Sequence, residues 1–128
     1  MERVQRHFQE ELDALTTRLL AMGGLAEERV RESVHGLVDR DADALDTVTT
    51  GDEPINDLHI EIDDRCFKLL ALHQPMAADL RVIVAAVKIN TDLERMGDLA
   101  VSVAQRAMSL NKLAAPLGQP LKDMPRMA

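Results

Sequence analysis

Two carboxylates, Glu94 and Asp98, stand four residues apart in the stretch KINTDLERMGD, residues 88–98. On a helix this spacing places both side chains on one face, one above the other. On a helical wheel the pair borders the apolar arc of the segment, whereas the basic side chains of the segment fall on the opposite face. Carboxylates beside an apolar seam can ligate a hard metal cation when further oxygen ligands face them.

The preceding helical segment offers such ligands, because Asp52 and Asn56 lie on one polar column of it. If the two helices fold back antiparallel around Pro75, Asp52 comes level with Asp98 and Asn56 comes level with Glu94. Carboxylate and amide oxygens favour magnesium, manganese or iron over zinc, which prefers imidazole and thiolate ligands. The residues therefore predict a metal site made by these four side chains, and the alternative is a solvated acidic flank that binds no ion.

Other residues with reactive side chains indicate structural roles. His59 shares the polar column with Asn56 and is typical of a surface histidine, and His73 precedes Gln74 and Pro75 in a turn. Cys66 lies on an apolar stripe without a basic partner that could lower the pKa of its thiol, so it indicates a buried small hydrophobe. The sequence shows no Ser/His/Asp constellation, no Gly-rich phosphate loop and no paired-cysteine metal motif.

Three helical segments must position these residues, because apolar side chains recur at steps of three and four. The first is expected over about 3–39, interrupted by Gly23 and Gly24, which indicate either a tolerated weak point or, as we favour, a close approach of a neighbouring helix. The second runs from an N-cap at Asp41 to about residue 72, and Pro54 indicates either a kink or a fresh helix start within it. The third spans about 77–110.

The composition supports a helical bundle. Aromatic residues make up only 2% of the 128 residues, so a core must consist of aliphatic side chains and methionine. We therefore predict an all-α fold, an antiparallel three-helix bundle over residues 1–112. Residues 113–128 contain several prolines and read as a linker that leads toward a second unit.

Net charge excludes some classes of partner. The formal net charge is -7, which disfavours nucleic acid and acidic membrane surfaces. A single cysteine rules out an internal disulfide and favours a reducing compartment. No apolar run is long enough to insert into a membrane, so we expect a cytoplasmic protein.

Two stretches resemble a known family. LLALHQPMAADLR at 69–81 and IVAAVKINTDLERMGD at 83–98 are similar to the PhoU family of phosphate-signalling proteins, as are GDEPINDL at 51–58 and FQEELDAL at 8–15. The resemblance covers about residues 3–110. It implies a three-helix bundle that binds metal clusters through Glu/Asp-x-x-x-Asp motifs. Glu94 and Asp98 match that motif, whereas its counterpart has Asp52 followed by the amide of Asn56.

The resemblance also implies a function. Members of the family resemble adaptors that restrain phosphate uptake and phosphate-starvation signalling, through a membrane-associated sensor histidine kinase and the ATPase of the phosphate transporter. No catalysis is implied. The family carries two such three-helix repeats, and this chain supplies one.

Two other functions stay open at this stage. One is a carboxylate metalloenzyme built on a helical bundle, although such sites require a Glu-x-x-His pair on each of two helices and the sequence holds that spacing once, at Glu32 and His35. The other is a structural interaction module without a metal. Leu80, Val84 and Val87 extend the apolar surface of the third segment beyond one neighbouring helix, and an uncovered apolar patch predicts an interface. We therefore expect a homodimer.

Overall fold

The computed structural model describes residues 2–51 and 53–113, and these residues form helices without any strand. The helices are α1 (Glu2–Asp39), α2 (Ala42–Thr50), α3 (Glu53–His73) and α4 (Ala77–Leu113). The predicted all-α class and the first and third helices are confirmed, with α4 extending one turn further than expected. Asp52 and residues 114–128 lie outside the described residues. The linker predicted at 113–128 therefore lies outside them, except for residue 113.

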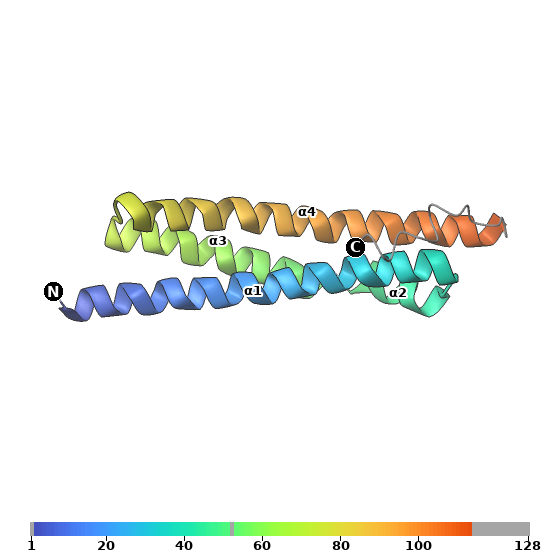
Figure 1. Cartoon of the computed structure of the whole chain (residues 1–128), viewed down its shortest axis with the longest axis horizontal. Coiled ribbons are helices and arrows are strands. Elements are labelled where there is room, and N and C mark those ends of the chain that lie inside the picture. Colours follow the sequence, from blue (N-terminus) through green and yellow to red (C-terminus); the bar gives the residue numbers. More distant parts are fainter. Residues whose placement is uncertain (1, 52, 114–128) are drawn as a thin grey trace.

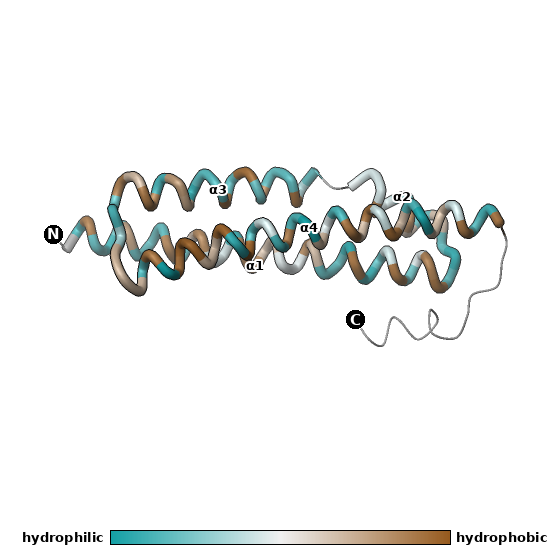
Figure 2. The backbone as a smooth tube through the Cα atoms, turned by 90° about the horizontal axis from the view of Figure 1, so that it is seen from above, coloured by the Kyte–Doolittle hydropathy of each residue, from teal (hydrophilic) through white to brown (hydrophobic). Residues whose placement is uncertain are grey.

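The helices form three rods whose axes lie side by side (Figure 1). α1 and α4 run in the same direction along the length of the molecule, and α2 and α3 follow each other in the opposite direction, with α3 between the two long helices in this view. Viewed from above, α2 and α3 lie along one side of the α1–α4 pair (Figure 2). Consecutive rods are antiparallel, as the sequence predicted.

The middle rod is divided into two helices rather than kinked. α2 ends at Thr50 with Gly51 as its C-cap, and α3 begins at Glu53. Pro54 falls in the first turn of α3, where its missing N–H leaves no helical hydrogen bond unmade. The fresh helix start is therefore the correct alternative at Pro54.

Local capping fixes the turn between α1 and α2. The Oδ1 atom of Asp41 accepts hydrogen bonds from the backbone N–H of Asp43 at 3.1 Å and of Ala44 at 3.2 Å, so Asp41 is the predicted N-cap. The tip of α2 also contacts α1, where Nη1 of the buried Arg29 donates to the carbonyl O of Val48 at 3.1 Å. These bonds hold the short helix against the long rods.

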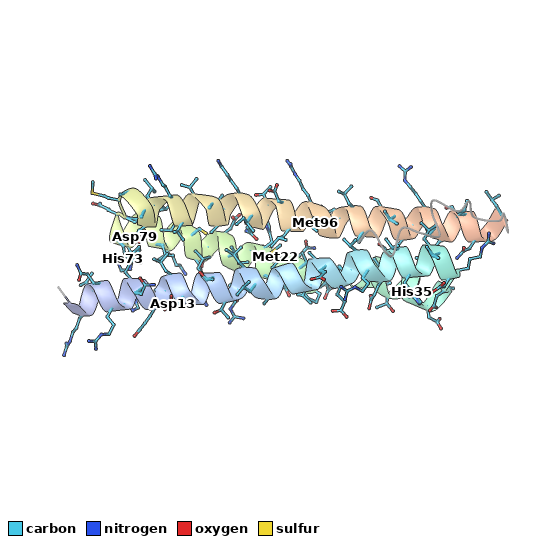
Figure 3. The ribbon with its side chains drawn as sticks, viewed as in Figure 1. Asp13, Met22, His35, His73, Asp79 and Met96 are labelled. Atoms are coloured by element: carbon cyan, nitrogen blue, oxygen red, sulfur yellow. The ribbon has the colours of Figure 1, made fainter. Side chains whose placement is uncertain are left out.

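Two groups of buried side chains fill the bundle. The first core joins α1, α3 and the first half of α4, and its fully buried members include Leu15, Met22, Ile62 and Ile83. Met22 lies midway along α1 (Figure 3). The second core joins α2 to the second half of α4 and consists of Leu45, Val48, Ala100, Ala104 and Ala107. Aliphatic and small side chains therefore make the whole described core.

The prediction for Gly23 and Gly24 was wrong. A Cβ atom added at either glycine would meet nothing within 4 Å, so no neighbouring helix approaches there. The close approach occurs instead at Gly36, where a Cβ would lie 2.5 Å from Cδ2 of Leu45. Gly23 and Gly24 are thus a tolerated weak point of α1, at a cost of about 1 kcal/mol each relative to alanine.

Candidate metal centre

Glu94 meets a histidine across the α3–α4 seam. The Nε2 atom of His59 lies 2.7 Å from Oε2 of Glu94, and 4.0 Å from Oδ2 of Asp63 one turn along α3. The side chains of His59 and Glu94 are 22% and 31% exposed, so the contact sits at the edge of the core, within reach of solvent ions. An imidazole and a carboxylate from two helices therefore converge at one point.

A buried amide side chain forms hydrogen bonds to groups beside this contact. Asn90 of α4 is fully buried, and its Nδ2 donates to the backbone O of His59 at 3.0 Å and to Oδ1 of Asp63 at 3.2 Å. The Nδ1 atom of His59 and the Oδ1 atom of Asn90 are buried and have no hydrogen-bond partner among the residues that the structure describes. We call His59, Asp63, Asn90 and Glu94 the seam cluster. Two buried polar atoms of this cluster could thus each form a hydrogen bond that they do not form.

The four residues predicted as metal ligands occupy different positions. Glu94 is half-buried, with its carboxylate on His59, and Asp98 is exposed one turn further along α4. Asn56 is exposed on α3, and no hydrogen bond between described residues joins it to Glu94 or Asp98. Asp52 lies outside the described residues. Among residues 2–51 and 53–113, no three His, Cys, Asp or Glu side chains are arranged to hold a metal ion.

The described donors nevertheless suit a metal as a pair. Imidazole nitrogen and carboxylate oxygen are both common ligands of borderline cations such as iron, manganese and zinc. Two ligand atoms bound to one such cation, each at about 2.1 Å, lie roughly 3 Å apart. The 2.7 Å separation between His59 and Glu94 is close to that value. The pair therefore fits one edge of a coordination shell after a small movement.

Sequence reasoning missed Asn90 and treated His59 as a surface residue. A signal for Asn90 was present, because it interrupts the regular apolar stripe of α4, whose other buried members include Ile83, Ala86 and Gly97. A polar side chain at such a position is expected to have a specific hydrogen-bond partner. The interpretation of Cys66 is confirmed, since it is 1% exposed and burial raises the pKa of its thiol to about 11.

The sequence of this chain is similar to those of known proteins. A family model of the PhoU domain matches residues 19–107. The chain belongs to the PhoU family. It is 40% identical over 126 residues to the phosphate-specific transport system accessory protein PhoU homolog of Caulobacter vibrioides, a match that covers 98% of this chain and 54% of that protein. The PhoU homolog of Pseudomonas aeruginosa is 42% identical over 107 residues, covering 84% of this chain and 44% of the relative.

A solved structure shows the same fold. The crystal structure of PhoU from Pseudomonas aeruginosa matches with a TM-score of 0.88 at 39% sequence identity, over 93% of this chain and 58% of that chain. The chain thus spans about half the length of the curated PhoU relatives that it matches. Within the described residues, no helix is both long enough and apolar enough to cross a bilayer.

Proposed function

We propose that this chain is a non-enzymatic, cytoplasmic regulatory adaptor that negatively regulates phosphate uptake and phosphate-starvation signalling. The observation that carries this proposal is the match to proteins named phosphate-specific transport system accessory protein along 98% of the chain. The thiol of Cys66 is buried and has a raised pKa, which argues against catalysis by this cysteine, because a nucleophilic cysteine needs the opposite environment. The proposed partners are a membrane-associated sensor histidine kinase and the ATPase of the phosphate transporter.

A reporter strain tests the regulatory role. The chain is expressed in bacteria that lack their own PhoU-family protein and carry a phosphate-starvation reporter. We expect the reporter, which is active in high phosphate without the chain, to be repressed when the chain is present. Soluble expression without repression would contradict the adaptor proposal, and binding of the purified chain to the isolated transporter ATPase would separate the two proposed partners.

Metal binding is the second part of the proposal. The proposed ligands are Asp52, Asn56, Glu94 and Asp98, and the proposed ion is iron, manganese or magnesium, bound singly or as a cluster. Support comes from the Glu94–Asp98 spacing on α4 and from the half-buried carboxylate of Glu94 at the α3–α4 seam. Glu94 and Asp98 would hold the cation, which would neutralise their negative charges.

Metal analysis of tag-free protein tests this part. We expect the wild-type chain to retain metal and the double variant Glu94→Ala/Asp98→Ala to lose it, while both have the same helical circular dichroism. The variant should stay folded, because removing like charges offsets the lost ligation. The matched control is Asp43→Ala/Asp46→Ala, which removes two exposed acidic residues of α2 and should keep the metal. Equal metal content in both double variants would refute the ligand assignment.

A homodimer is the third part of the proposal. Leu80, Val84 and Val87 on α4 are 39%, 42% and 36% exposed, so the apolar surface anticipated from the sequence is accessible. A hollow of about 410 Å³ lies beside it, lined partly by Val87 and by Phe67, whose exposure is 71%. A second copy of the chain can cover this face by self-complementary pairing.

Light scattering tests the dimer. We expect twice the chain mass of 14.2 kDa for the wild type and the monomer mass for Phe67→Glu/Val87→Glu. The control is Leu20→Glu on α1, an exposed apolar residue away from this face. A wild-type mass near 14.2 kDa at high micromolar concentration, with and without metal, would contradict the proposal.

A further inference from the structure

The outer face of α4 carries four basic side chains in one line. Arg81, Lys88 and Arg95 are 7 residues apart, and Arg106 follows after another 11 residues. Because 7 residues are close to two helical turns and 11 are close to three, all four lie on one face of α4, along roughly 38 Å of its length. Each is exposed, and Figure 3 shows nitrogen-tipped side chains that project from α4 away from the other helices. We call Arg81, Lys88, Arg95 and Arg106 the basic row.

The basic row has no ion-pair partner among residues 2–51 and 53–113. On α3, by contrast, Nε of Arg65 lies 3.1 Å from Oε2 of Glu61, and Nζ of Lys68 lies 2.8 Å from Oδ2 of Asp64. Asp92 lies on the same side of α4 as the row, and its single carboxylate leaves the row with an excess of positive charge. An acidic chain, of net charge -7, thus presents one basic face whose charges the described residues do not balance.

Exposed apolar side chains accompany the basic row. Ile89, Met96 and Leu99 are 46%, 41% and 64% exposed. Ile89 and Met96 follow Lys88 and Arg95 directly in the sequence, so both lie on the same side of the row. Cations that only solvate a helix need no apolar neighbours. A charged row with an apolar strip along it is typical of a surface that packs against an amphipathic helix, where the apolar side chains give contact area and the charges choose the partner.

We propose that the basic row docks an acidic amphipathic helix of a partner protein. This inference names the chemistry of a partner for the proposed adaptor and rests on that proposed function. Carboxylates at every seventh position of a helix recur at intervals of about 10 Å, which is the interval between Arg81, Lys88 and Arg95. Apolar side chains beside those carboxylates then contact the strip of Ile89 and Met96. A broad acidic surface such as a membrane matches less well, because the net charge of -7 opposes its approach.

Synthetic peptides test the proposal. One fluorescein-labelled helical peptide carries glutamate at every seventh position with leucines on the adjacent face, and a second peptide of the same composition has its glutamates distributed around the helix. We expect the full chain to bind the first peptide more tightly, as measured by fluorescence anisotropy, and to lose affinity as salt is added. Lys88→Glu/Arg95→Glu should weaken binding of the first peptide by about tenfold or more, because like charges then face each other.

Two double variants are matched controls. Arg3→Glu/Arg6→Glu makes the same change of net charge at exposed residues of α1, and it should bind the first peptide as the wild type does. Lys88→Arg/Arg95→Lys keeps both charges of the row and should also bind. Equal helical circular dichroism and thermal unfolding of all variants show that lost binding does not come from unfolding.

Other occupants of this face give different results. Equal affinity of the wild type and Lys88→Glu/Arg95→Glu for the first peptide would overturn the proposal. Binding of the wild type to vesicles of phosphatidylserine and phosphatidylcholine, but to neither peptide, would overturn it in favour of a lipid surface. Light scattering in which Lys88→Glu/Arg95→Glu converts a dimer to a monomer would assign the row to a second copy of the chain and would also overturn it.

The reporter strain separates this inference from the function on which it rests. Loss of repression by Lys88→Glu/Arg95→Glu, with repression kept by Arg3→Glu/Arg6→Glu, supports the docking surface. Repression by all variants contradicts the docking surface, while the adaptor function stands. If the wild type itself fails to repress, the adaptor function fails, and the peptide measurements still decide whether the row recognises an acidic helix.

Discussion

Asn90 on α4 donates a 3.0 Å hydrogen bond from Nδ2 to the backbone O of His59 on α3. The side chain of Asn90 is fully buried, and its second bond, of 3.2 Å, reaches the exposed carboxylate of Asp63. We predict that Asn90→Ala lowers the free energy of unfolding by about 1–3 kcal/mol, as measured by urea denaturation. Gln105→Ala, an exposed amide on the same helix, should change it by less than about 0.5 kcal/mol. Equal effects would show that the buried hydrogen bonds contribute nothing measurable.

Leucines on α1 provide a test of the first core. Leu15 is 1% exposed, whereas Leu20 on the same helix is 73% exposed. Leu15→Ala removes buried apolar surface and leaves a cavity, so it should lower the free energy of unfolding by about 2–5 kcal/mol. Leu20→Ala should have almost no effect in the same denaturation experiment. A comparable loss in both variants would mean that Leu20 is covered in solution.

Replacement of a glycine on α1 by alanine should lower the free energy of unfolding at Gly36 and raise it at Gly24. A Cβ at Gly36 would lie 2.5 Å from the fully buried side chain of Leu45 and 3.3 Å from the backbone O of Asp41, so Gly36→Ala should destabilise the protein by about 1–3 kcal/mol. At Gly24 a Cβ meets nothing within 4 Å, and Gly24→Ala should stabilise the protein by about 0.5–1 kcal/mol through helix propensity. Thermal melts of both variants measure the difference, and a stabilising Gly36→Ala would refute the close contact with α2.

Cys66 gives stability a dependence on alkaline pH. Burial, with a smaller contribution from the carboxylate of Asp63, raises the pKa of the thiol from an ordinary value of 9.0 to about 11 in the folded state. Between these values the unfolded chain loses the proton while the folded chain keeps it. The contribution of the thiol to stability is therefore complete below pH 9 and is lost as the pH rises toward 11.

Urea denaturation at several pH values, with Cys66→Ala as the comparison, isolates this effect from lysine titration. The variant is expected to be less stable at neutral pH because it has a small cavity, but its stability should fall less steeply above pH 9 than that of the wild type. Parallel stability curves for the two proteins would rule out a raised thiol pKa.

The helices were predictable because their signals are local. Asp41 caps α2, Pro54 lies in the first turn of α3, and apolar residues at steps of three and four mark α4 as a helix, although Ile89 and Met96 of that pattern are exposed. Gly23 and Gly24 show the limit of this approach. A glycine pair permits a close helix contact but does not require one, and only the packed structure shows that Gly36 has this role.

The contact that Glu94 makes across the seam lies further along α3 than the predicted level, for a geometric reason. Folding the chain around Pro75 matched Cα positions and set Asn56 level with Glu94. Helical side chains, however, lean toward the N-terminus of their own helix. In antiparallel helices the two leans point in opposite directions, so the tips that meet belong to residues further along each chain. Glu94 therefore reaches His59, one turn beyond Asn56. The spacing of residues along the sequence predicts which side chains meet only when the direction of each side chain is included.

The brevity of α2 has a consequence for hydrogen exchange. Its nine residues are too few to form a stable helix alone, since isolated helices need about 12–15 residues even for favourable sequences. Protection of its amide hydrogens must come from docking, through Leu45 and Val48 on the alanine stripe of α4 and through contacts with α1 such as the bond from Arg29 to Val48. When these contacts open, we expect α2 to lose its helix as one unit while the first core stays closed. Hydrogen exchange should then give the amides of α2 a lower opening free energy than the amides around the first core.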